Sequence, residues 1–593
     1  MHKSTFRILT VPVVSFLIFV MACQQSPQTV GEVMDRVVAD LYESYEIDEL
    51  NSLTDSTILT MLSEQEKKVL AEEYWQFKIN VPAIVSVMRH KDQRTVPFWL
   101  EPKGFEKTDL TVSNDHYTYE VWQKRFEPGW VNLGINGFDK HRPVYFVSVK
   151  PVSANDDLVL TDFYPDNQTV IEMETGAFTY HDWDELVLLE VPESLQKGKL
   201  LTTIRGRARE AHLIGAFRTT PFPSREKPDQ IMLTWSEEPQ TTQTIQWRTA
   251  SENDNGVVEV WPARDKADKR IINAESDRLK DRLLANDPVI HRYTAVIRDL
   301  QPGQQYDYRV GHPDSDNWSA EYTFQTAPEP GTPFSFIYFG DTHRSPAWGE
   351  LVTRLPDRYD DIAFYTIAGD MVGTGLYRDD WDQLFAYSGE VFASDPLMPS
   401  LGNHDNQDGL GPGMFLELFD LPDNGPASMQ PERVYAFEYS NALFLMLDAT
   451  GPKQTQAAWL DSTLAASDAT WKIAVFHFPP YAETMEYPDI QAQWGEMFDR
   501  YHVDLAMSGH VHYYMRTRPI ANQRVVESPA DGTIYLISIA IPDHNRSAER
   551  PDYAEVMFSG EQLYQKIDIQ GNQLSYTAYN RDDQVRDEFV IVK

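Results

Sequence analysis

The chain has 593 residues, several times the typical domain length of about 100–150 residues, so we expect roughly two to four domains. Hydrophobic residues make up 42% and aromatic residues 12%, which is ordinary for a globular protein with a sizeable core. The formal net charge of −38, from 90 acidic against 52 basic residues, argues against nucleic acid as a partner, because binding the phosphate backbone needs Lys and Arg.

The first 22 residues have the pattern of an export signal. Lys3 and Arg7 precede an apolar run, residues 8–21, which is shorter than the about 20 residues of a spanning helix. The run ends in VMAC, and its Cys23 is the only cysteine of the chain, so no internal disulfide can form.

This pattern resembles a bacterial lipoprotein signal, which implies that Cys23 is lipidated and becomes the new N-terminus. Gln24 is a residue that usually permits sorting to the outer membrane in Gram-negative lipoproteins. We therefore expect an exported protein, lipid-anchored to the cell envelope and facing the periplasm or the surface, with residues 23–31 as a flexible tether. The alternative is a plain signal peptide with an incidental cysteine.

Residues 32–225 form an α+β region in which no catalytic constellation is visible. Helix-like spacing covers residues 32–43 and 54–76, with Ser63 as a possible helix start, and β-rich runs follow up to residue 225. Four tryptophans here either form a sugar-binding face or belong to the core: Trp99, Trp122, Trp130 and Trp183. The role of this region stays open.

Residues 226–327 contain six short β-rich runs at regular spacing. The segment LQPGQQYDYRV at residues 300–310 carries tyrosines near the final pair of runs, which indicates an immunoglobulin-like sandwich and resembles a fibronectin type III domain. The Pro/Gly-rich segment 327–332 is the expected domain boundary.

From residue 333 to 545, strand-like runs alternate with helix-like stretches, which indicates a layered α/β domain. Residues 435–448 have the pattern of a hairpin. Residues 555–593 read as three further strands that complete the edge of a sheet in this domain.

Five apolar runs of the α/β domain each stop at residues that can bind a metal ion. They read FIYFGDTHR at 336–344, YTIAGDMVGTG at 365–375, PSLGNHD at 399–405, VFHFPP at 475–480 and MSGHVH at 507–512. Buried parallel strands look like this when their carboxyl ends open onto a site. The candidate ligands are Asp341, His343, Asp370, Asn403, His477, His510 and His512.

Carboxylate, amide and imidazole ligands suit Mn, Fe(II) or Zn, and seven are too many for one tetrahedral ion, so two divalent ions about 3.5–4 Å apart are expected. Taken singly, each Gly-Asp could be a turn and each His a core residue. All five motifs in this order indicate a metal site.

The motifs GDTH, GDMVGTG, GNHD, VFHF and GHVH resemble the metallophosphoesterase superfamily, the calcineurin-like phosphoesterases, over roughly a third of the chain. The resemblance implies a four-layer α/β sandwich. It also implies one ion bound by Asp341, His343 and His512, a second bound by Asn403, His477 and His510, and Asp370 as the bridge. His404 would be the catalytic histidine that binds no metal, and Asp405 the carboxylate that orients it.

The preceding sandwich and the HFPPY run at residues 477–481 make the chain similar to purple acid phosphatases. Two departures matter: Gly373 stands where those enzymes have a ligand tyrosine, and they lack the histidine found here at His343. The purple charge-transfer colour should therefore be absent, and a ferric ion is not required. The further active-site histidine of the plant members has no counterpart between His477 and His502.

The resemblance implies hydrolysis of a small phosphate ester by a metal-bridging hydroxide, with His404 as general acid. The simplest activity is that of a phosphomonoesterase. Phosphodiesters, nucleotides or sulfate esters are alternative substrates, and a surface binding protein with a decayed site is a third possibility. Arg344 is a candidate substrate contact or an ordinary salt bridge, and Tyr481 a candidate pocket residue. The substrate, the native metals and the oligomeric state stay open.

Overall fold

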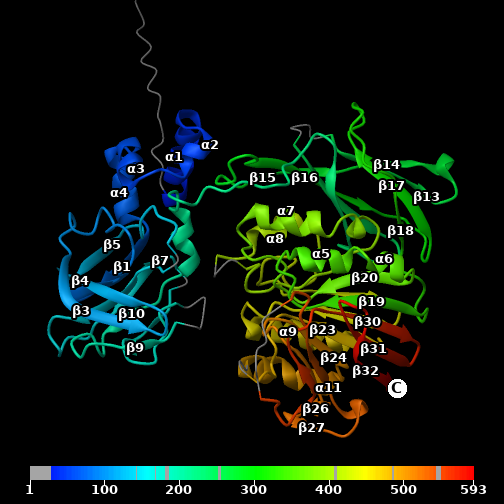
Figure 1. The fold of residues 1–593 in the computed structure, drawn as a ribbon. Coiled ribbons are helices and arrows are strands. Elements are labelled where there is room, and N and C mark those ends of the chain that lie inside the picture. The colour runs from blue at the N-terminus through cyan, green and yellow to red at the C-terminus, as the bar shows by residue number, and fades with distance from the viewer. Residues whose placement is uncertain are drawn as a thin grey trace, which may run out of the picture.

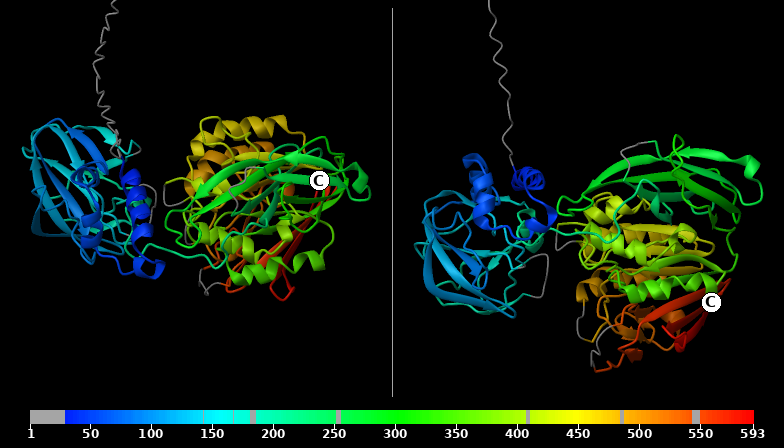
Figure 2. Two further views of the ribbon diagram at one scale, coloured as in Figure 1. Left: turned by 90° about the horizontal axis from the view of Figure 1, so that it is seen from above. Right: turned by 45° about the horizontal axis from the view of Figure 1, so that its top comes forward.

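A computed structural model describes residues 29–593 except 142, 167, 181–185, 251–254, 407–409, 484–486 and 543–548. The expected export signal, Cys23 and nearly all of the tether lie outside the described residues. Figures 1 and 2 show an N-terminal region beside a β-sandwich that is stacked on an α/β domain. Among the described residues, no helix has both the length and the apolarity that crossing a membrane requires.

The N-terminal region combines four helices with two sheets around one large core cluster. Its helices are α1 (Val30–Ser44), α2 (Ile47–Leu50), α3 (Asp55–Met61) and α4 (Glu64–Glu72). Its strands are β1 (Trp75–Ile79), β2 (Ala83–His90), β3 (Glu106–Asn114), β4 (Thr118–Phe126), β5 (Gly129–Leu133), β6 (Phe146–Pro151), β7 (Leu160–Tyr164), β8 (Val170–Glu172), β9 (Leu188–Glu190) and β10 (Lys199–Leu201). The sheets have the orders β5-β1-β7 and β8-β10-β6-β2-β4-β3-β9.

The helix expected over residues 54–76 is two helices, and the prediction of Ser63 as a helix start is confirmed. The Ser63 side chain and Glu66 form a capping box at the start of α4, because each accepts a hydrogen bond from the other's backbone amide. Helix α3 ends at Met61, before this capping box, and α4 ends at Glu72. Strand β1 begins at Trp75, inside the range expected to be helical.

The tryptophans of the N-terminal region do not form a common face. Trp99 and Trp122 are buried, and the Trp99 indole donates to the carbonyl of Ile135 at 2.8 Å. Trp130 is exposed, with the Lys78 ammonium 4.6 Å from its ring centre. The sugar-binding reading is therefore wrong for Trp99 and Trp122, and Trp183 lies outside the described residues.

The middle of the chain is a sandwich of two four-stranded sheets, with orders β11-β12-β16-β15 and β14-β13-β17-β18. Its strands are β11 (Asp229–Thr234), β12 (Gln243–Thr249), β13 (Val257–Pro262), β14 (Arg270–Asn273), β15 (Glu275–Lys280), β16 (Val289–Ile297), β17 (Gln305–Gly311) and β18 (Tyr322–Gln325). The Tyr306 hydroxyl accepts from the Gln301 amide at 3.0 Å, which fixes the turn that enters β17.

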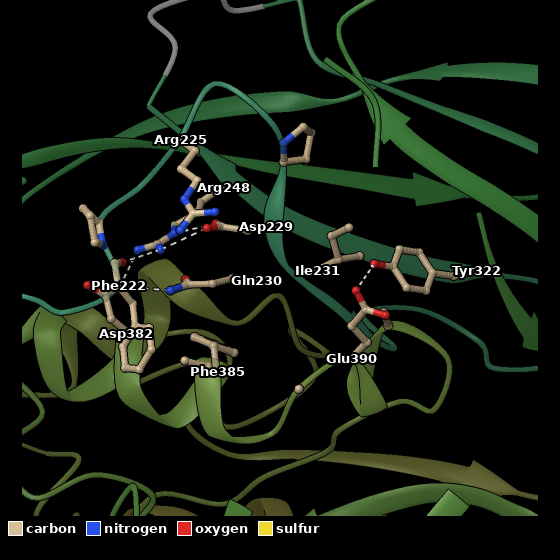
Figure 3. Close-up of a pocket in the computed structure, with 15 residues that line it drawn as sticks. Phe222, Arg225, Asp229, Gln230, Ile231, Arg248, Tyr322, Asp382, Phe385 and Glu390 are labelled. Carbon is tan, nitrogen blue, oxygen red and sulfur yellow. Dashed lines mark hydrogen bonds and ion pairs between the residues drawn. The ribbon is translucent and has the colours of Figure 1, made fainter. Parts of the chain in front are cut away.

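A buried ionic cluster joins the sandwich to the α/β domain. The Arg248 guanidinium on β12 pairs with Asp229 at 2.7 Å and with Asp382 of helix α7 (Arg378–Tyr387), to which Gln230 also donates at 2.9 Å. Figure 3 shows this cluster at one end of a cavity of about 320 Å³. None of the described residues lining that cavity is a predicted metal ligand, so it is a feature of the domain junction.

The α/β domain contains two sheets with orders β20-β19-β30-β31-β32 and β21-β22-β23-β24-β28-β25-β29. Its strands are β19 (Phe334–Phe339), β20 (Ile362–Ile367), β21 (Tyr435–Tyr439), β22 (Ala442–Met446), β23 (Trp471–Val475), β24 (Leu505–Ser508), β25 (Tyr514–Thr517), β28 (Ile534–Ile537), β29 (Ala554–Phe558), β30 (Leu563–Gln570), β31 (Gln573–Asn580) and β32 (Val585–Val592). A separate small ladder pairs β26 (Ile520–Ala521) with β27 (Arg524–Val525). The remaining helices are α5 (Pro346–Val352), α6 (Leu355–Arg358), α8 (Gly413–Leu418), α9 (Lys453–Ala466), α10 (Pro488–Ile490) and α11 (Glu496–Tyr501).

The two sheets pack face to face between two helical layers. Phe336 of β19 meets Phe444 of β22 edge-on, with ring centres 5.2 Å apart. On the outer faces, Trp348 of α5 packs on Phe339, and Leu460 of α9 belongs to the second sheet's outer cluster. The sandwich rests on the layer of α5 to α8 (Figure 1).

Two expectations about strand pairing are confirmed. β21 and β22 form an antiparallel hairpin, and β30, β31 and β32 extend the first sheet from β19. The parallel pairs β19/β20, β22/β23, β23/β24 and β24/β28 align their carboxyl ends, where the candidate ligands follow.

Candidate metal centre

The candidate ligands follow directly on the carboxyl ends of four parallel strands. Asp341 follows β19, Asp370 follows β20 and His477 follows β23, while His510 and His512 follow β24. Asn403 is different because it follows no regular strand. Its segment touches the sheet only through isolated bridges, from Leu397 to Tyr365 and from Ser400 to Ala368.

Several of these side chains stand on unusual backbone. His343, Asp370, His510 and His512 have φ angles of 43°, 51°, 74° and 48°, in the left-handed region. Non-glycine residues adopt this region rarely and at an energetic cost, and such residues cluster at functional sites. The surrounding fold therefore holds four of the seven candidate ligands in conformations that their local sequence disfavours.

One group of ligand atoms is built on Asp341, which is fully buried. Its Oδ2 lies 2.9 Å from Nε2 of His512 and 3.5 Å from Nε2 of His343. The two imidazole nitrogens face each other at 3.3 Å. One ligand atom from each of the three residues fits within a span of 4.8 Å, which is close enough to bind one ion.

A second group is built on Asp370, whose Oδ2 lies 3.1 Å from Nε2 of His477. The same nitrogen is 3.0 Å from Oδ1 of Asn403. Asp370, His477 and His510 again offer ligand atoms within 4.8 Å of one another. Close approach is possible because a Cβ on Gly402 would lie 2.2 Å from Oδ1 of Asp370.

Asp370 also connects the two groups. Its Oδ2 lies 3.9 Å from Nε2 of His343, and a third set of ligand atoms combines Asp370 with His343 and His404. The carboxylate thus lies between the Asp341 group and the His477 group. This is the position that a bridging ligand between two ions requires.

Burial and the charges of nearby carboxylates shift the pKa values of the site histidines in opposite directions. Burial lowers the pKa of His343, but the hydrogen bond to Asp341 and the charge of Asp370 raise it to about 9. Burial also lowers the pKa of His477, but the charge of Asp370 and its hydrogen bond raise that pKa to about 9. Burial, with a smaller contribution from His477, lowers the pKa of His510 to about 3.

The donor set fits two divalent metal ions. Among the described residues, every ion pair of Asp341 and Asp370 is with a histidine, so no Lys or Arg neutralises these buried carboxylates. Buried carboxylates without such a partner are costly, and a cation removes that cost. Oxygen and imidazole donors in this mixture suit Mn, Fe or Zn.

His404 stands at the open side of the cluster. Its Nδ1 lies 2.7 Å from the carbonyl of Gly373, and its backbone amide donates to Oδ1 of Asp370 at 2.9 Å. Its Nε2 is 3.9 Å from Asp370, and about a third of its side chain is exposed. The ring can therefore reach a molecule at the site without being fixed as a ligand.

The prediction that Asp405 orients His404 is wrong. The Asp405 carboxylate accepts hydrogen bonds from the backbone amides of Met371 at 3.0 Å, Val372 at 3.3 Å and Gly402 at 2.9 Å. It ties the loop after β20 to the loop that carries Asn403. Burial, with help from the Asp370 charge, raises the pKa of Asp405 to about 7.

The two candidate substrate contacts, Arg344 and Tyr481, each have protein partners in the structure. Arg344 pairs with Asp380 at 2.7 Å and is only partly exposed, which matches the salt-bridge alternative. Tyr481 is 8% exposed and lies in a hydrophobic cluster, with its ring centre 4.7 Å from that of Tyr535. Tyr481 lines a cavity together with Gln491 and Tyr535, and none of the described residues lining that cavity is a predicted metal ligand, so its role as a substrate contact stays a prediction.

One aromatic residue at the site was missed from the sequence. The Tyr487 hydroxyl lies 2.8 Å from Nε2 of His510. No histidine lies between His477 and His502, and a tyrosine ten positions after His477 gives no signal of its own in the sequence. Only the tertiary structure brings it to the ligand group.

Comparison with known proteins agrees with this arrangement. Residues 334–514 match the calcineurin-like phosphoesterase family, and residues 228–326 match the purple acid phosphatase N-terminal domain. All seven candidate ligands lie within the segment that matches the calcineurin-like phosphoesterases. With the sandwich in front of it, the protein is calcineurin-like and purple-acid-phosphatase-like.

Individual relatives match part of the chain. It is 26% identical to "Probable inactive purple acid phosphatase 24" of Arabidopsis thaliana over 298 residues, 41% of this chain and 48% of that protein. It is 24% identical to "Fe(3+)-Zn(2+) purple acid phosphatase 12" of the same plant, over 52% of this chain and 68% of that protein. The chain spans about half the length of the first of these relatives.

A solved structure shows the same fold. The purple acid phosphatase PPD1 from yellow lupin (Lupinus luteus) seeds superposes with a TM-score of 0.55 at 16% identity. The match covers 87% of this chain and 93% of the lupin chain. The multidomain prediction, a metallophosphoesterase domain preceded by an all-β sandwich and a further N-terminal region, is confirmed.

Proposed function

We propose that the chain is a binuclear metal-dependent phosphoesterase, most simply a phosphomonoesterase acting on small phosphate esters. The observation that carries this proposal is the position of Asp370 between two groups of ligand atoms at the ends of parallel strands. The match of residues 334–514 to the calcineurin-like phosphoesterases supports it.

In this proposal Asp341, His343 and His512 hold one ion, and Asn403, His477 and His510 hold the other, with Asp370 shared. When bound, a pair of divalent ions supplies Lewis acidity toward phosphoryl oxygens and lowers the pKa of water. The low-dielectric surroundings of the buried carboxylates strengthen that effect. The protein's own large negative charge otherwise repels a phosphate ester.

His404 is the proposed general acid. With Nδ1–H donating to the Gly373 carbonyl, the protonated ring gives its Nε2 proton to the oxygen of the departing alcohol as the P–O bond breaks. The ring is left neutral and regains a proton from solvent through its exposed side. General acid catalysis of this kind contributes about 10²–10⁴-fold.

The test is hydrolysis of p-nitrophenyl phosphate by the purified chain. We expect activity that a chelator abolishes and that Mn or Zn restores. Activity that survives complete metal removal would contradict the proposal. Comparing rates on bis-p-nitrophenyl phosphate and p-nitrophenyl sulfate decides between monoesters, diesters and sulfate esters.

A non-catalytic binding protein is the competing proposal, and the name "probable inactive" of one plant relative gives it weight. The retained ligand groups weigh against it. Metal analysis separates the two, because a decayed site should hold well under two ions per chain.

We also expect a colourless protein. Gly373 replaces the tyrosine ligand of purple acid phosphatases, and a Cβ there would lie 3.2 Å from Asp380 and 3.5 Å from Arg344, so the ion pair fills that space. The iron-loaded chain should lack a visible charge-transfer band. A strong purple band on loading ferric iron would contradict this expectation.

We further propose export and lipid anchoring through Cys23. The support is the charged and apolar pattern of residues 1–22 before the single cysteine. Expressed in a Gram-negative host, the full chain should partition with membranes, and Cys23→Ser should release it to the soluble fraction. Equal partitioning of both proteins would rule out a lipid on this residue.

A further inference from the structure

Three histidines of the site present the same ring nitrogen to the ligand cluster. Nδ1 of His343 lies 3.3 Å from the carbonyl of Val372, and Nδ1 of His477 lies 2.8 Å from that of Ala368. His404 uses the Gly373 carbonyl in the same way. In each ring a backbone carbonyl takes the Nδ1–H, so Nε2 carries the lone pair or the mobile proton that faces the cluster.

His510 is oriented the other way round. Its Nε2 faces a side-chain hydroxyl, that of Tyr487, at 2.8 Å. His510 nevertheless belongs to the ligand group of Asp370 and His477. With Nε2 facing the tyrosine, Nδ1 is the nitrogen that can serve that group.

The hydrogen-bond direction then follows from the chemistry of imidazole. A ring that binds a cation is neutral and carries one N–H and one lone pair. If the tyrosine donated to Nε2, Nδ1 would carry the hydrogen and could not bind an ion. Cation binding at Nδ1 therefore requires Nε2–H to donate to the Tyr487 oxygen.

Tyr487 is held in place by contacts on two sides. Its ring is stacked on Phe478 with centres 4.6 Å apart and planes at 2°, and Phe478 meets His510 edge-on at 4.6 Å. Helix α10 begins at the next residue, and its Asp489 pairs with Lys453 of α9 at 3.1 Å. The hydroxyl therefore approaches His510 from a braced side chain.

We propose that Tyr487 is a positioning residue that accepts a hydrogen bond from Nε2–H of His510 and so presents Nδ1 of His510 to a divalent ion. The inference rests on the two-ion site of the proposed function. It assigns to a tyrosine the role that backbone carbonyls have for the neighbouring histidines. Partners of this kind typically change metal affinity by about 10–100-fold.

The test is metal binding by Tyr487→Phe, which keeps the ring on Phe478 and removes only the hydroxyl. Metal-free protein is titrated calorimetrically with Zn²⁺, and Co²⁺ loading is followed by its visible spectrum. We expect one of two binding events to weaken about 10–100-fold, with a changed Co²⁺ spectrum, and the other event to stay as in the unmodified chain.

Tyr501→Phe is the matched control, because the Tyr501 hydroxyl contacts Asp461 at 3.0 Å on the outer helices. It should bind both ions as the unmodified chain does. Circular dichroism of each variant checks that the fold is kept.

Two Zn²⁺ bound by Tyr487→Phe with unchanged affinities and an unchanged Co²⁺ spectrum would overturn the inference. A different result would show that the proposed function itself is wrong. If the unmodified chain binds fewer than two ions, the two-ion site is wrong and the inference falls with it.

Discussion

Two clusters of buried and partly buried histidines lie in the described part of the chain, one in the N-terminal region and one in the α/β domain. In the N-terminal region, Nδ1 of His90 lies 2.9 Å from Nε2 of His141, with the rings stacked at 5.1 Å. Burial lowers the pKa of His141 to about 4 and that of nearby His212 to about 3. In the α/β domain, His343 is partly exposed and His477 is fully buried, and the pKa values of both rise to about 9.

The difference lies in the carboxylates. Asp341 and Asp370 are buried among the histidines of the α/β domain, whereas among the described residues the carboxylate paired with His90 is that of the exposed Asp92, at 3.9 Å. Within the part of the chain that the structure describes, groups of three close ligand atoms occur only around Asp341 and Asp370. Buried imidazoles alone thus form a neutral packed cluster, and buried carboxylates turn the same residue type into a cation site.

The largest effect should come from removing the shared carboxylate. Asp370→Asn keeps the side-chain shape and removes the negative charge between the two ligand groups. We expect p-nitrophenyl phosphate hydrolysis to fall about 10³-fold, the scale seen when a single transition-state-stabilising group is removed. The matched change in the other cluster, His90→Ala, should leave the rate unchanged, and a comparable loss from His90→Ala would break the comparison.

His404→Ala should have the next largest effect. The ring contacts the Gly373 carbonyl and stands beside the ligand groups, so its loss should cost about 10²–10⁴-fold in kcat. Metal content should stay at the level of the unmodified chain. A variant that loses its ions as well would make His404 a ligand and not a proton donor.

Asp405→Asn should give a smaller, combined effect. An amide cannot accept at both ends, so at least one of the backbone amides of Met371 and Gly402 loses its partner, at a cost of about 1–3 kcal/mol. We expect thermal stability and ion affinity to fall together. Constant ion affinity with only a moved pH profile of kcat would show that Asp405 does not hold the metal-site loops together.

The smallest effect concerns the acid stability of the N-terminal region. The folded pKa of His212 is lowered, so the unfolded chain takes up the proton first, and stability is lost as the pH falls from about 6.5 toward 3. Between pH 7 and pH 5 this one group costs about 2 kcal/mol.

His212→Gln should reduce that pH sensitivity by the same amount. Hydrogen exchange of the N-terminal strands at the two pH values measures it. Equal sensitivity of His212→Gln and the unmodified chain would show that His212 is not buried in its neutral form.

Most of the ligand set could be predicted from the sequence because six of the seven candidate ligands follow one of four strands, and only Asn403 follows an irregular segment. The apolar run before Asp341, Asp370 or His477 indicates a buried strand, and the polar residue after it indicates where that strand ends at a site. The fold of the α/β domain follows from the same alternation.

What could not be predicted depends on partners far apart in the chain. Asp405 and His404 are adjacent, yet Asp405 contacts the amides of Met371 and Val372 instead, because the loops after β20 and around Asn403 close on it. Tyr487 reaches His510 only through the packing of α10. The boundary between α3 and α4 was missed because the apolar spacing of residues 54–76 continues across the cap at Ser63.

The central claim is that carboxylates, and not imidazoles alone, create a two-ion site in one cluster only. Metal analysis of the purified full chain, loaded with Zn²⁺ and dialysed, tests it most directly. The account predicts two ions per chain, a clear loss of bound metal in Asp370→Asn and no change in His90→Ala. Fewer than one ion in the unmodified chain, or equal losses in both variants, would contradict it.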